Sequence, residues 1–244
     1  MTSRSHAPTV SVIMANRNAG SYVGEAVRSV LDQSLADLEL VFIDDASSDD
    51  SVRRAQDAGQ GDPRLRIGRF TTQLGPGGAR NRALALARGR WIAVVDSDDL
   101  ITPQRLERLV AFAQAQNADI AADNLLVFSD GVERGALLRG RRWRQAREIR
   151  LAEFTLSNRA FGSPTPLGFL KPLIRRATLA RTGVAYDESL RIGEDFDLIA
   201  RLLAAGARYW IDPTPLYRYR KHAQSTSHRL RGADIEALLR VLRG

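Results

Sequence analysis

The sequence predicts an α/β protein with a mostly parallel sheet flanked by helices, and three observations support this prediction. Short apolar runs rich in β-branched residues alternate with stretches that carry apolar residues at helical spacing. Several of these runs end directly in acidic or amide residues. Such alternation favours right-handed crossovers, so the carboxyl ends of the strands lie along one edge of the sheet. Ligands bind outside that edge, which makes the polar residues there candidates for function.

Apolar segments in the first half of the chain predict buried strands. They occupy residues 10–15, 38–43, 65–67, 91–95 and 119–127. Helical spacing predicts helices at residues 21–33, 48–58, 79–88 and 102–116. Thr102 is the predicted N-cap of the last helix, with Pro103 at its first position.

The pattern changes after Ser129. Residues 130–172 are rich in arginine, glycine and proline, which predicts irregular structure. Further on, the sequence predicts a helix at residues 194–205, short strands at 209–211 and 216–219, and a closing amphipathic helix at 230–242. No internal repeat or linker is visible, so we expect one domain over residues 1–244, with its two halves meeting near residues 128–129.

The composition suits a globular domain and excludes several kinds of site. The chain has 244 residues, of which 44% are hydrophobic, and this allows a sizeable core. It has no cysteine, which excludes disulfides, thiolate nucleophiles and cysteine-based zinc sites. No apolar run approaches the roughly 18 residues of a membrane span, and the polar start lacks a signal-peptide pattern. We therefore expect a cytoplasmic protein, with a peripheral position on the inner membrane as an option.

Basic residues give the chain a net charge of +8 and gather in two stretches. The first, called the basic segment below, contains Arg134, Arg139, Arg141, Arg142, Arg144, Arg147 and Arg150. The second contains Arg218, Arg220, Lys221, Arg229 and Arg231. Such stretches attract phosphate groups on nucleic acid, anionic lipid or a diphosphate ligand, or simply form a solvated basic surface. We favour a phosphate-carrying acceptor or an anionic membrane over nucleic acid, because the aromatic residues form no stacking platform in sequence.

Three carboxylates follow the strand predicted at residues 91–95. They belong to Asp96, Asp98 and Asp99. Like charges so close repel one another unless a positive group joins them. Carboxylate oxygens are the ligands that Mg²⁺ and Mn²⁺ prefer, and such ions keep positions open for phosphate oxygens. We therefore expect a divalent metal, Mn²⁺ or Mg²⁺, with helix capping as the alternative.

Two further motifs suit nucleotide binding. Asp44 and Asp45 follow the strand at residues 38–43, where a carboxylate could accept hydrogen bonds from a base or a ribose, or form a capping turn. The sequence Gly75-Pro76-Gly77-Gly78 predicts a glycine-rich loop leading into a helix, whose N-terminus favours an anion. Arg80 adds a forked donor for phosphate.

The last candidates lie in the second half. Glu194 and Asp195 open a predicted helix, where carboxylates are stabilised as anions. This placement suits a general base and equally a helix cap. His222 follows the last predicted strand, and its position is compatible with a structural role or with contact to a metal or diphosphate.

The order of the motifs is more specific than any one of them. The ordered segments are Ser11-Val12-Ile13-Met14 with Asn18, the run Val41-Phe42-Ile43-Asp44-Asp45-Ala46-Ser47-Ser48-Asp49, then Gly75-Pro76-Gly77-Gly78-Ala79-Arg80-Asn81, Val94-Val95-Asp96-Ser97-Asp98-Asp99 and Gly193-Glu194-Asp195-Phe196-Asp197-Leu198. Through them the chain resembles the family 2 glycosyltransferases of GT-A fold, over roughly residues 9–228. The resemblance implies a nucleotide-sugar-binding half at about residues 9–128 and an acceptor-binding half at about 129–244.

The resemblance also implies roles on the donor side. Asp45 would contact uracil or an equivalent base, with Asn18 and Arg80 near the nucleotide. Arg17 stands where many relatives have an aromatic residue, and its guanidinium could stack on the base. Asp96 and Asp98 would form the Asp-x-Asp motif that touches the sugar or ribose and the metal.

Asp99 is then the alternative metal ligand, and His222 resembles a late histidine that some members direct at the metal or diphosphate. Asp195 would be the catalytic base, with Glu194 beside it at the acceptor. The implied activity is an inverting, metal-dependent transfer from a nucleotide-sugar, with UDP expected, to a saccharide hydroxyl in bacterial exopolysaccharide or other surface-polysaccharide synthesis. A lipid-diphosphate-linked saccharide is one candidate acceptor. The alternatives are a sugar-1-phosphate nucleotidyltransferase and a basic nucleic-acid-binding protein.

Overall fold

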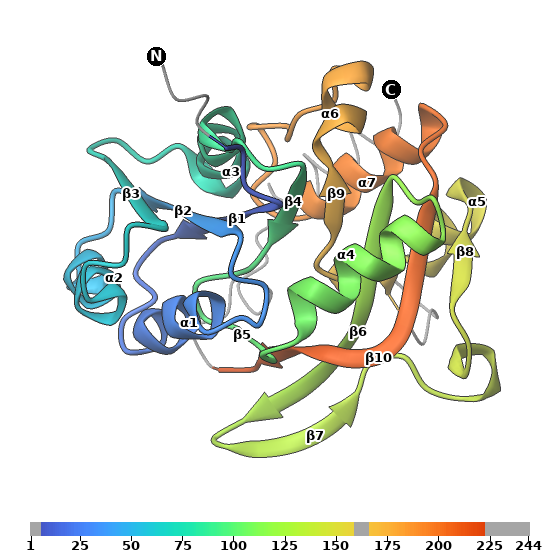
Figure 1. The fold of residues 1–244 in the computed structure, drawn as a ribbon, viewed down its shortest axis with the longest axis horizontal. Helices are drawn as coiled ribbons and strands as arrows, with labels where there is room; N and C mark the ends of the chain where they lie inside the picture. The colour runs from blue at the N-terminus through green and yellow to red at the C-terminus, as the bar shows by residue number, and fades with distance from the viewer. Residues whose placement is uncertain (1–5, 159–165, 223–244) are drawn as a thin grey trace.

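The computed structural model describes residues 6–158 and 166–222 of the chain, and Figure 1 shows how they fold. One mixed sheet runs through these residues in the strand order β3-β2-β1-β4-β9-β6-β10-β5. In addition, β7 pairs with β6 and β8 pairs with β10. Helices cover the sheet on its faces, so the predicted α/β class is confirmed.

The first half of the chain forms a parallel sheet. Its strands are β1 (Val10–Asn16), β2 (Leu38–Asp45), β3 (Leu65–Phe70) and β4 (Trp91–Val94). They are joined by α1 (Tyr22–Leu31), α2 (Ser51–Gly59) and α3 (Gly75–Leu86). In Figure 1, α1 and α2 lie together on one side of these strands and α3 lies on the other. All pairings among the four strands are parallel, so β1, β2 and β4 end at the same edge.

The rest of the chain extends the sheet through antiparallel pairs, apart from β6 and β10, which are parallel to each other. Its strands are β5 (Leu100–Ile101), β6 (Ile120–Ser129), β7 (Val132–Ala136), β8 (Arg147–Ile149), β9 (Leu173–Arg175) and β10 (Tyr209–Arg220). Its helices are α4 (Arg105–Ala115), α5 (Leu151–Ser157), α6 (Arg176–Thr182) and α7 (Glu194–Ala204), with 3-10 turns η1 (Arg141–Trp143) and η2 (Leu167–Phe169). Strand β9 is antiparallel to both β4 and β6 and thereby joins the two halves. The segment predicted as irregular therefore contains short strands and a helix.

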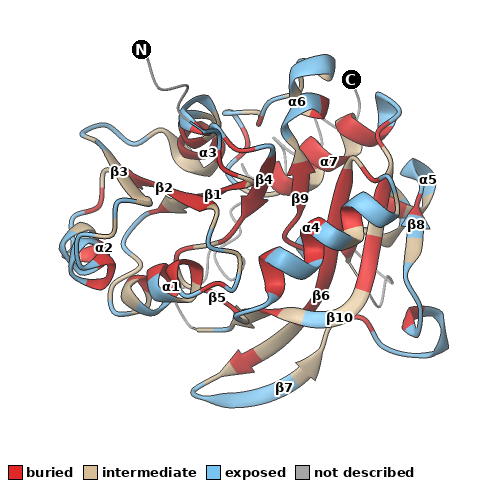
Figure 2. Ribbon diagram, viewed as in Figure 1, coloured by how far each residue is buried: buried red, intermediate tan, exposed pale blue. Residues whose placement is uncertain are grey.

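The core follows the buried strands, as the red segments of Figure 2 show. Every residue of β2 is buried, and so is all of β4. Such continuous burial is typical of parallel strands with helices on both faces. It explains why these strands appear in the sequence as uninterrupted apolar runs.

The glycine-rich segment was predicted as a loop, and this prediction is wrong. Residues 75–78 form the first turn of α3, with proline at one of its first two positions, where its missing N–H costs nothing. A Cβ atom on Gly77 would lie 2.8 Å from the carbonyl oxygen of Asp187. Position 77 therefore requires glycine, because the backbone of Asp187 lies too close to this turn of α3 for a side chain.

Thr102 was predicted to cap α4, and this too is wrong, because the helix begins at Arg105 after Gln104. The N–H of Thr102 donates to the carbonyl of Leu216 in β10 at 2.9 Å, and its carbonyl accepts from Gln33 at 2.7 Å. These bonds hold Thr102 at the margin of the sheet.

The two short strands predicted near the C-terminus are one strand, β10, whose register with β6 shifts around Pro215. Proline removes a backbone donor from the ladder, which explains the broken pattern in the sequence. The helix predicted at residues 230–242 lies outside the described residues. Within the described part of the chain, no helix combines the length and apolar character needed to cross a membrane.

Candidate active site

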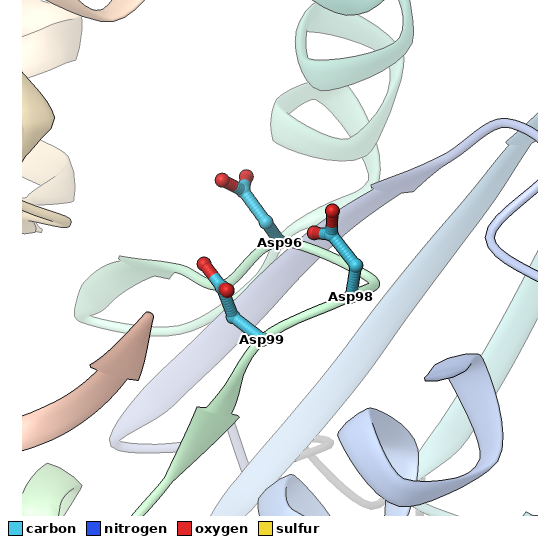
Figure 3. A group of neighbouring side chains, drawn as sticks. All are labelled: Asp96, Asp98 and Asp99. Atoms are coloured by element: carbon cyan, nitrogen blue, oxygen red, sulfur yellow. The ribbon is translucent and has the colours of Figure 1, made fainter. Parts of the chain in front are cut away.

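Three aspartates gather on the loop that leaves β4. Asp96, Asp98 and Asp99 each place a carboxylate oxygen within 4.8 Å of the others. Figure 3 shows the three carboxyl groups raised on the same side of this loop. Asp99 is buried, whereas Asp96 and Asp98 are partly exposed. The cluster consists of hard oxygen donors with an open side, and this fits Mg²⁺ or Mn²⁺.

A buried network of charges joins this loop to α7. Arg80 on α3 donates to Asp96 at 2.9 Å and pairs with Glu194. The Nζ atom of Lys171 lies 2.7 Å from Asp96 Oδ2 and 2.9 Å from Asp195 Oδ2. Two cations thus hold three carboxylates from the loop after β4 and the start of α7. The fold thereby brings together Arg80 and Glu194, which lie 114 residues apart in the sequence.

The charges of this network shift the pKa values of its members. Burial alone would raise the pKa of Asp96, but Lys171 and Arg80 outweigh it and hold that pKa below its usual value. Burial would likewise lower the pKa of Lys171, but Asp195 and Asp96 raise it well above the usual range. Lys171 and Asp96 are therefore both charged at neutral pH.

The carboxyl groups of Glu194 and Asp99 have raised pKa values. Burial is the main cause for Glu194, and the charge of Arg80 offsets part of it. Burial also raises the pKa of Asp99 well above its usual value, and the charges of Asp98 and Asp96 add to the shift. Close carboxylates of this kind favour the arrival of a cation.

The end of β10 closes the other side of the aspartate cluster. The hydroxyl of Tyr217 donates to Asp99 Oδ2 at 2.7 Å, and the backbone N–H of Arg220 donates to Asp99 Oδ1 at 2.6 Å. His222 Nε2 lies 2.9 Å from Asp98 Oδ2, and its ring lies 4.7 Å from that of Tyr22. Sequence reasoning predicted the place of His222 near the aspartates but gave no role to Tyr217.

A second group lies beyond the ends of β1 and β2. The carboxylate of Asp45 accepts hydrogen bonds from the N–H groups of Leu74 and Gly75, at 2.6 and 3.0 Å. Arg17 donates to the carbonyl of Asp45 at 2.6 Å, and Asn18 accepts from the N–H of Ser48 at 2.8 Å. Asp45 thus binds the start of α3, the helix that carries Arg80. Within residues 6–158 and 166–222, no hydrogen bond or ion pair joins the side chains of Arg17, Asn18 or Asp45 to the aspartate cluster.

Part of the basic segment is neutralised within the protein. Arg142 and Arg147 both pair with Glu153, and both guanidinium groups lie over the ring of Trp143. Arg141, Arg144 and Arg150 are exposed, and they form no ion pair with a carboxylate of the described part of the chain. Arg229 and Arg231 of the second stretch lie outside the described residues.

The glycosyl transferase family 2 model matches residues 11–178. The succinoglycan biosynthesis proteins ExoO and ExoU of Rhizobium meliloti (strain 1021) are 39% and 41% identical to the chain, over 95% of its length in both cases. The chain covers 66% of ExoO and 68% of ExoU. It therefore spans about two thirds of the length of these relatives.

Solved structures of similar fold include S. aureus TarS 1-349. The complex of TarS with UDP-GlcNAc has a TM-score of 0.77 and 22% identity, over 96% of this chain and 65% of that one. The complex with UDP has a TM-score of 0.71 and 24% identity, over 96% of this chain and 63% of that one. This similarity confirms the predicted fold.

Proposed function

Because the chain belongs to glycosyl transferase family 2, we propose that it transfers a sugar from a nucleotide-sugar to a hydroxyl group of a saccharide acceptor, with inversion at the anomeric carbon. The observation that carries the proposal is the buried network in which Arg80 and Lys171 join the aspartate cluster to Glu194 and Asp195. In this proposal the aspartate cluster holds the metal, and the neighbouring carboxylate of Asp195 acts as the base. Family membership favours this activity over sugar-1-phosphate nucleotidyl transfer or nucleic-acid binding.

The donor side is formed by the strand ends of the first half. We assign the base of the nucleotide to Asp45, Asn18 and Arg17, and Arg80 to the vicinity of the phosphates. UDP is the expected nucleotide, since S. aureus TarS, which has a similar fold, has been solved in complex with UDP and with UDP-GlcNAc. The relatives in succinoglycan biosynthesis favour an exopolysaccharide or other bacterial surface polysaccharide as the product.

The residues that would hold the metal are Asp98 and Asp96, with Asp99 and His222 beside them. Asp98 is partly exposed. Within the described residues, His222 is the only side chain that contacts its carboxylate by a hydrogen bond. Asp99 is buried and already accepts two hydrogen bonds, which favours a supporting position. A bound Mn²⁺ or Mg²⁺ would neutralise charge on the departing diphosphate.

On the acceptor side, Asp195 is the proposed general base. Its carboxylate stands in the first turn of α7, where the helix N-terminus stabilises the anion. It would take the proton of the attacking hydroxyl, which approaches the anomeric carbon opposite the diphosphate. The carboxylate of Glu194 pairs with Arg80 and stands beside Asp195 in the first turn of α7.

We expect the chain to release UDP from at least one UDP-sugar when Mn²⁺ or Mg²⁺ is present, and to lose this activity in excess EDTA. The metal is needed because carboxylates alone repel the diphosphate. A nucleotide-release assay over a panel of UDP-, GDP- and dTDP-sugars, with a saccharide mixture as acceptor, measures both effects. Full activity in EDTA would contradict the metal assignment, whereas consumption of NTP with a sugar-1-phosphate would contradict the transferase proposal.

We also propose peripheral contact with an anionic membrane through Arg141, Arg144 and Arg150 of the basic segment, with a lipid-diphosphate-linked saccharide as a candidate acceptor. Each basic residue near an anionic surface contributes about 1 kcal/mol, and salt screens this attraction over about 10 Å. The chain should sediment with anionic phospholipid vesicles at low salt and stay in solution at high salt. Replacing the three arginines with glutamine should weaken sedimentation, and absence of binding at low salt would contradict the proposal.

A further inference from the structure

Lys171 occupies a position that neither the motifs nor the proposed roles explain. It lies just before β9, and its side chain is 8% exposed. Its ammonium group bridges two elements, since Nζ contacts Asp96 on the loop after β4 and Asp195 on α7. It therefore links the donor side of the proposed site to the proposed base at hydrogen-bond distance, whereas Arg80 lies 3.6 Å from Asp195.

The choice of lysine here is unusual for this chain. Of its 36 lysine and arginine residues, only Lys171 and Lys221 are lysines, and Lys221 is exposed. Arginine presents a wide planar fork, whereas an ammonium is a compact point charge. The same network uses arginine at position 80, where the guanidinium spans Asp96 and Glu194. At position 171 a compact ammonium lies between two carboxylate oxygens.

The two oxygens of the Asp195 carboxylate are held differently. Oδ2 accepts a hydrogen bond from Lys171 at 2.9 Å. Oδ1 is buried and accepts no hydrogen bond from the described residues; the nearest cationic atom in an ion pair with it is Arg80 Nη1, at 3.6 Å. A buried carboxylate oxygen with free lone pairs is costly unless a ligand completes it. Oδ1 is thus the oxygen of this carboxylate that has no hydrogen bond to the described residues.

The main chain of Lys171 is anchored as well. Its carbonyl accepts a hydrogen bond from Arg105 Nη2 at 2.7 Å. Arg105 in turn pairs with Asp123 at 2.8 Å, and both side chains are completely buried. The lysine is therefore fixed at its carbonyl by a hydrogen bond from the paired Arg105 and at its ammonium by Asp96 and Asp195, which favours a single orientation.

We propose that Lys171 is a positioning residue for the proposed base: it binds Asp195 Oδ2, fixes the carboxylate against the aspartate cluster, and leaves Oδ1 to take the proton of the acceptor hydroxyl. This inference rests on the proposed function of Asp195. Lys171 itself need not touch the substrate, since it acts through the carboxylate that it orients.

The test compares Lys171→Met and Lys171→Arg with the wild type, using the nucleotide-sugar of the panel that releases most nucleotide. A misplaced base costs about 100-fold, so Lys171→Met should lower kcat by about that factor while the KM for the donor changes little. Lys171→Arg keeps the positive charge but should not restore kcat, since the wide guanidinium fork does not reproduce the position of the ammonium between Asp96 and Asp195. Full recovery of kcat with arginine would mean that Lys171 only neutralises buried negative charge, and it would overturn the proposal. Arg181→Met, which removes one exposed positive charge from α6, is the control and should match the wild type.

The double variant Lys171→Met/Asp195→Asn tests whether the lysine acts through the aspartate. Residues that act as a unit are strongly non-additive. In the Asp195→Asn background, Lys171→Met should therefore lower kcat by less than about threefold. This limit is close to the usual error with which the effects of two independent mutations add. A further loss of about 100-fold would overturn the proposal.

A crystal structure of Lys171→Met gives a result that does not depend on turnover. We expect the Asp195 carboxylate to turn away from Asp96 and toward Arg80. An unchanged carboxylate would overturn the positioning role even if no donor is found. Failure of the wild type to consume any nucleotide-sugar would instead contradict the proposed function, so the two failures are distinguishable.

Discussion

Asp195→Asn is expected to lower the turnover of sugar transfer by about 10²–10⁴-fold, the usual contribution of a general base. The change removes the proton acceptor and keeps the shape of the side chain. The new amide oxygen can still accept the hydrogen bond that Lys171 Nζ donates to Oδ2 at 2.9 Å. Binding of UDP with Mn²⁺ should therefore be spared, as measured by calorimetry beside the nucleotide-release assay.

Asp197→Asn is the matched control for this prediction. Asp197 lies one residue beyond Phe196 on the same helix turn and is also buried, but it pairs with Arg201, at 2.9 Å to Nε. Its substitution should leave turnover close to that of the wild type. Turnover near the wild-type value in Asp195→Asn would remove that residue from the role of base, and equal losses in both variants would indicate damage to α7 instead.

The first half of the fold could be predicted because its signals are local. Strands β1, β2 and β4 are buried on both faces, so they are continuous apolar runs in the sequence. Their polar ends follow at once, as Asp45 and Asp96 show. The parallel topology then places these ends at one edge without any knowledge of contacts between side chains.

The second half could not be predicted in the same way, because its structure depends on distant pairings. Strand β9 has only three residues and exists because β4 and β6 lie on either side of it. Lys171 precedes it in a short apolar stretch with no motif, and only the pairing of β9 with β4 brings it to Asp96. Tyr217 was likewise hidden, since its hydroxyl reaches Asp99 across 118 residues of sequence.

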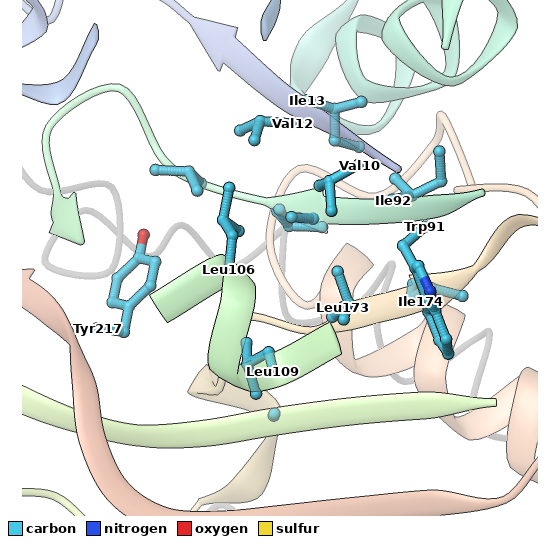
Figure 4. Packing of buried hydrophobic residues seen from close by; sticks show 14 of the residues in the cluster. Val10, Val12, Ile13, Trp91, Ile92, Leu106, Leu109, Leu173, Ile174 and Tyr217 are labelled. Carbon is cyan, nitrogen blue, oxygen red and sulfur yellow. The ribbon is translucent and has the colours of Figure 1, made fainter. Parts of the chain in front are cut away.

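Asp123→Asn is expected to destabilise the protein by about 3–5 kcal/mol, because it leaves the charge of Arg105 buried without its partner. Both side chains are 0% exposed, and Arg105 makes three hydrogen bonds to the carboxylate. Figure 4 shows its neighbour Leu106 packed in the core near Tyr217, whose ring lies 4.8 Å from the Arg105 guanidinium. At roughly 2–4 °C per kcal/mol for a domain of this size, the melting temperature should fall by about 6–20 °C in calorimetry.

The same substitution at an exposed ion pair provides the control. Asp57 pairs with Arg53 at 3.3 Å, and both side chains are more than 60% exposed. Asp57→Asn should cost no more than about 1 kcal/mol, since water already screens that pair. Equal effects at positions 57 and 123 would contradict the account of the buried pair.

The double variant Arg105→Met/Asp123→Leu separates the contribution of this pair to stability from its contribution to turnover. Apolar side chains of similar volume often replace a buried ion pair without loss of stability, so the melting temperature should largely recover. Turnover should not recover, because the carbonyl of Lys171 has lost the donor that Arg105 Nη2 supplies at 2.7 Å. Recovery of both would mean that the pair serves only the core. Recovery of stability alone would show that a polar pair is kept in an apolar interior because it holds Lys171, and through it Asp195, in place.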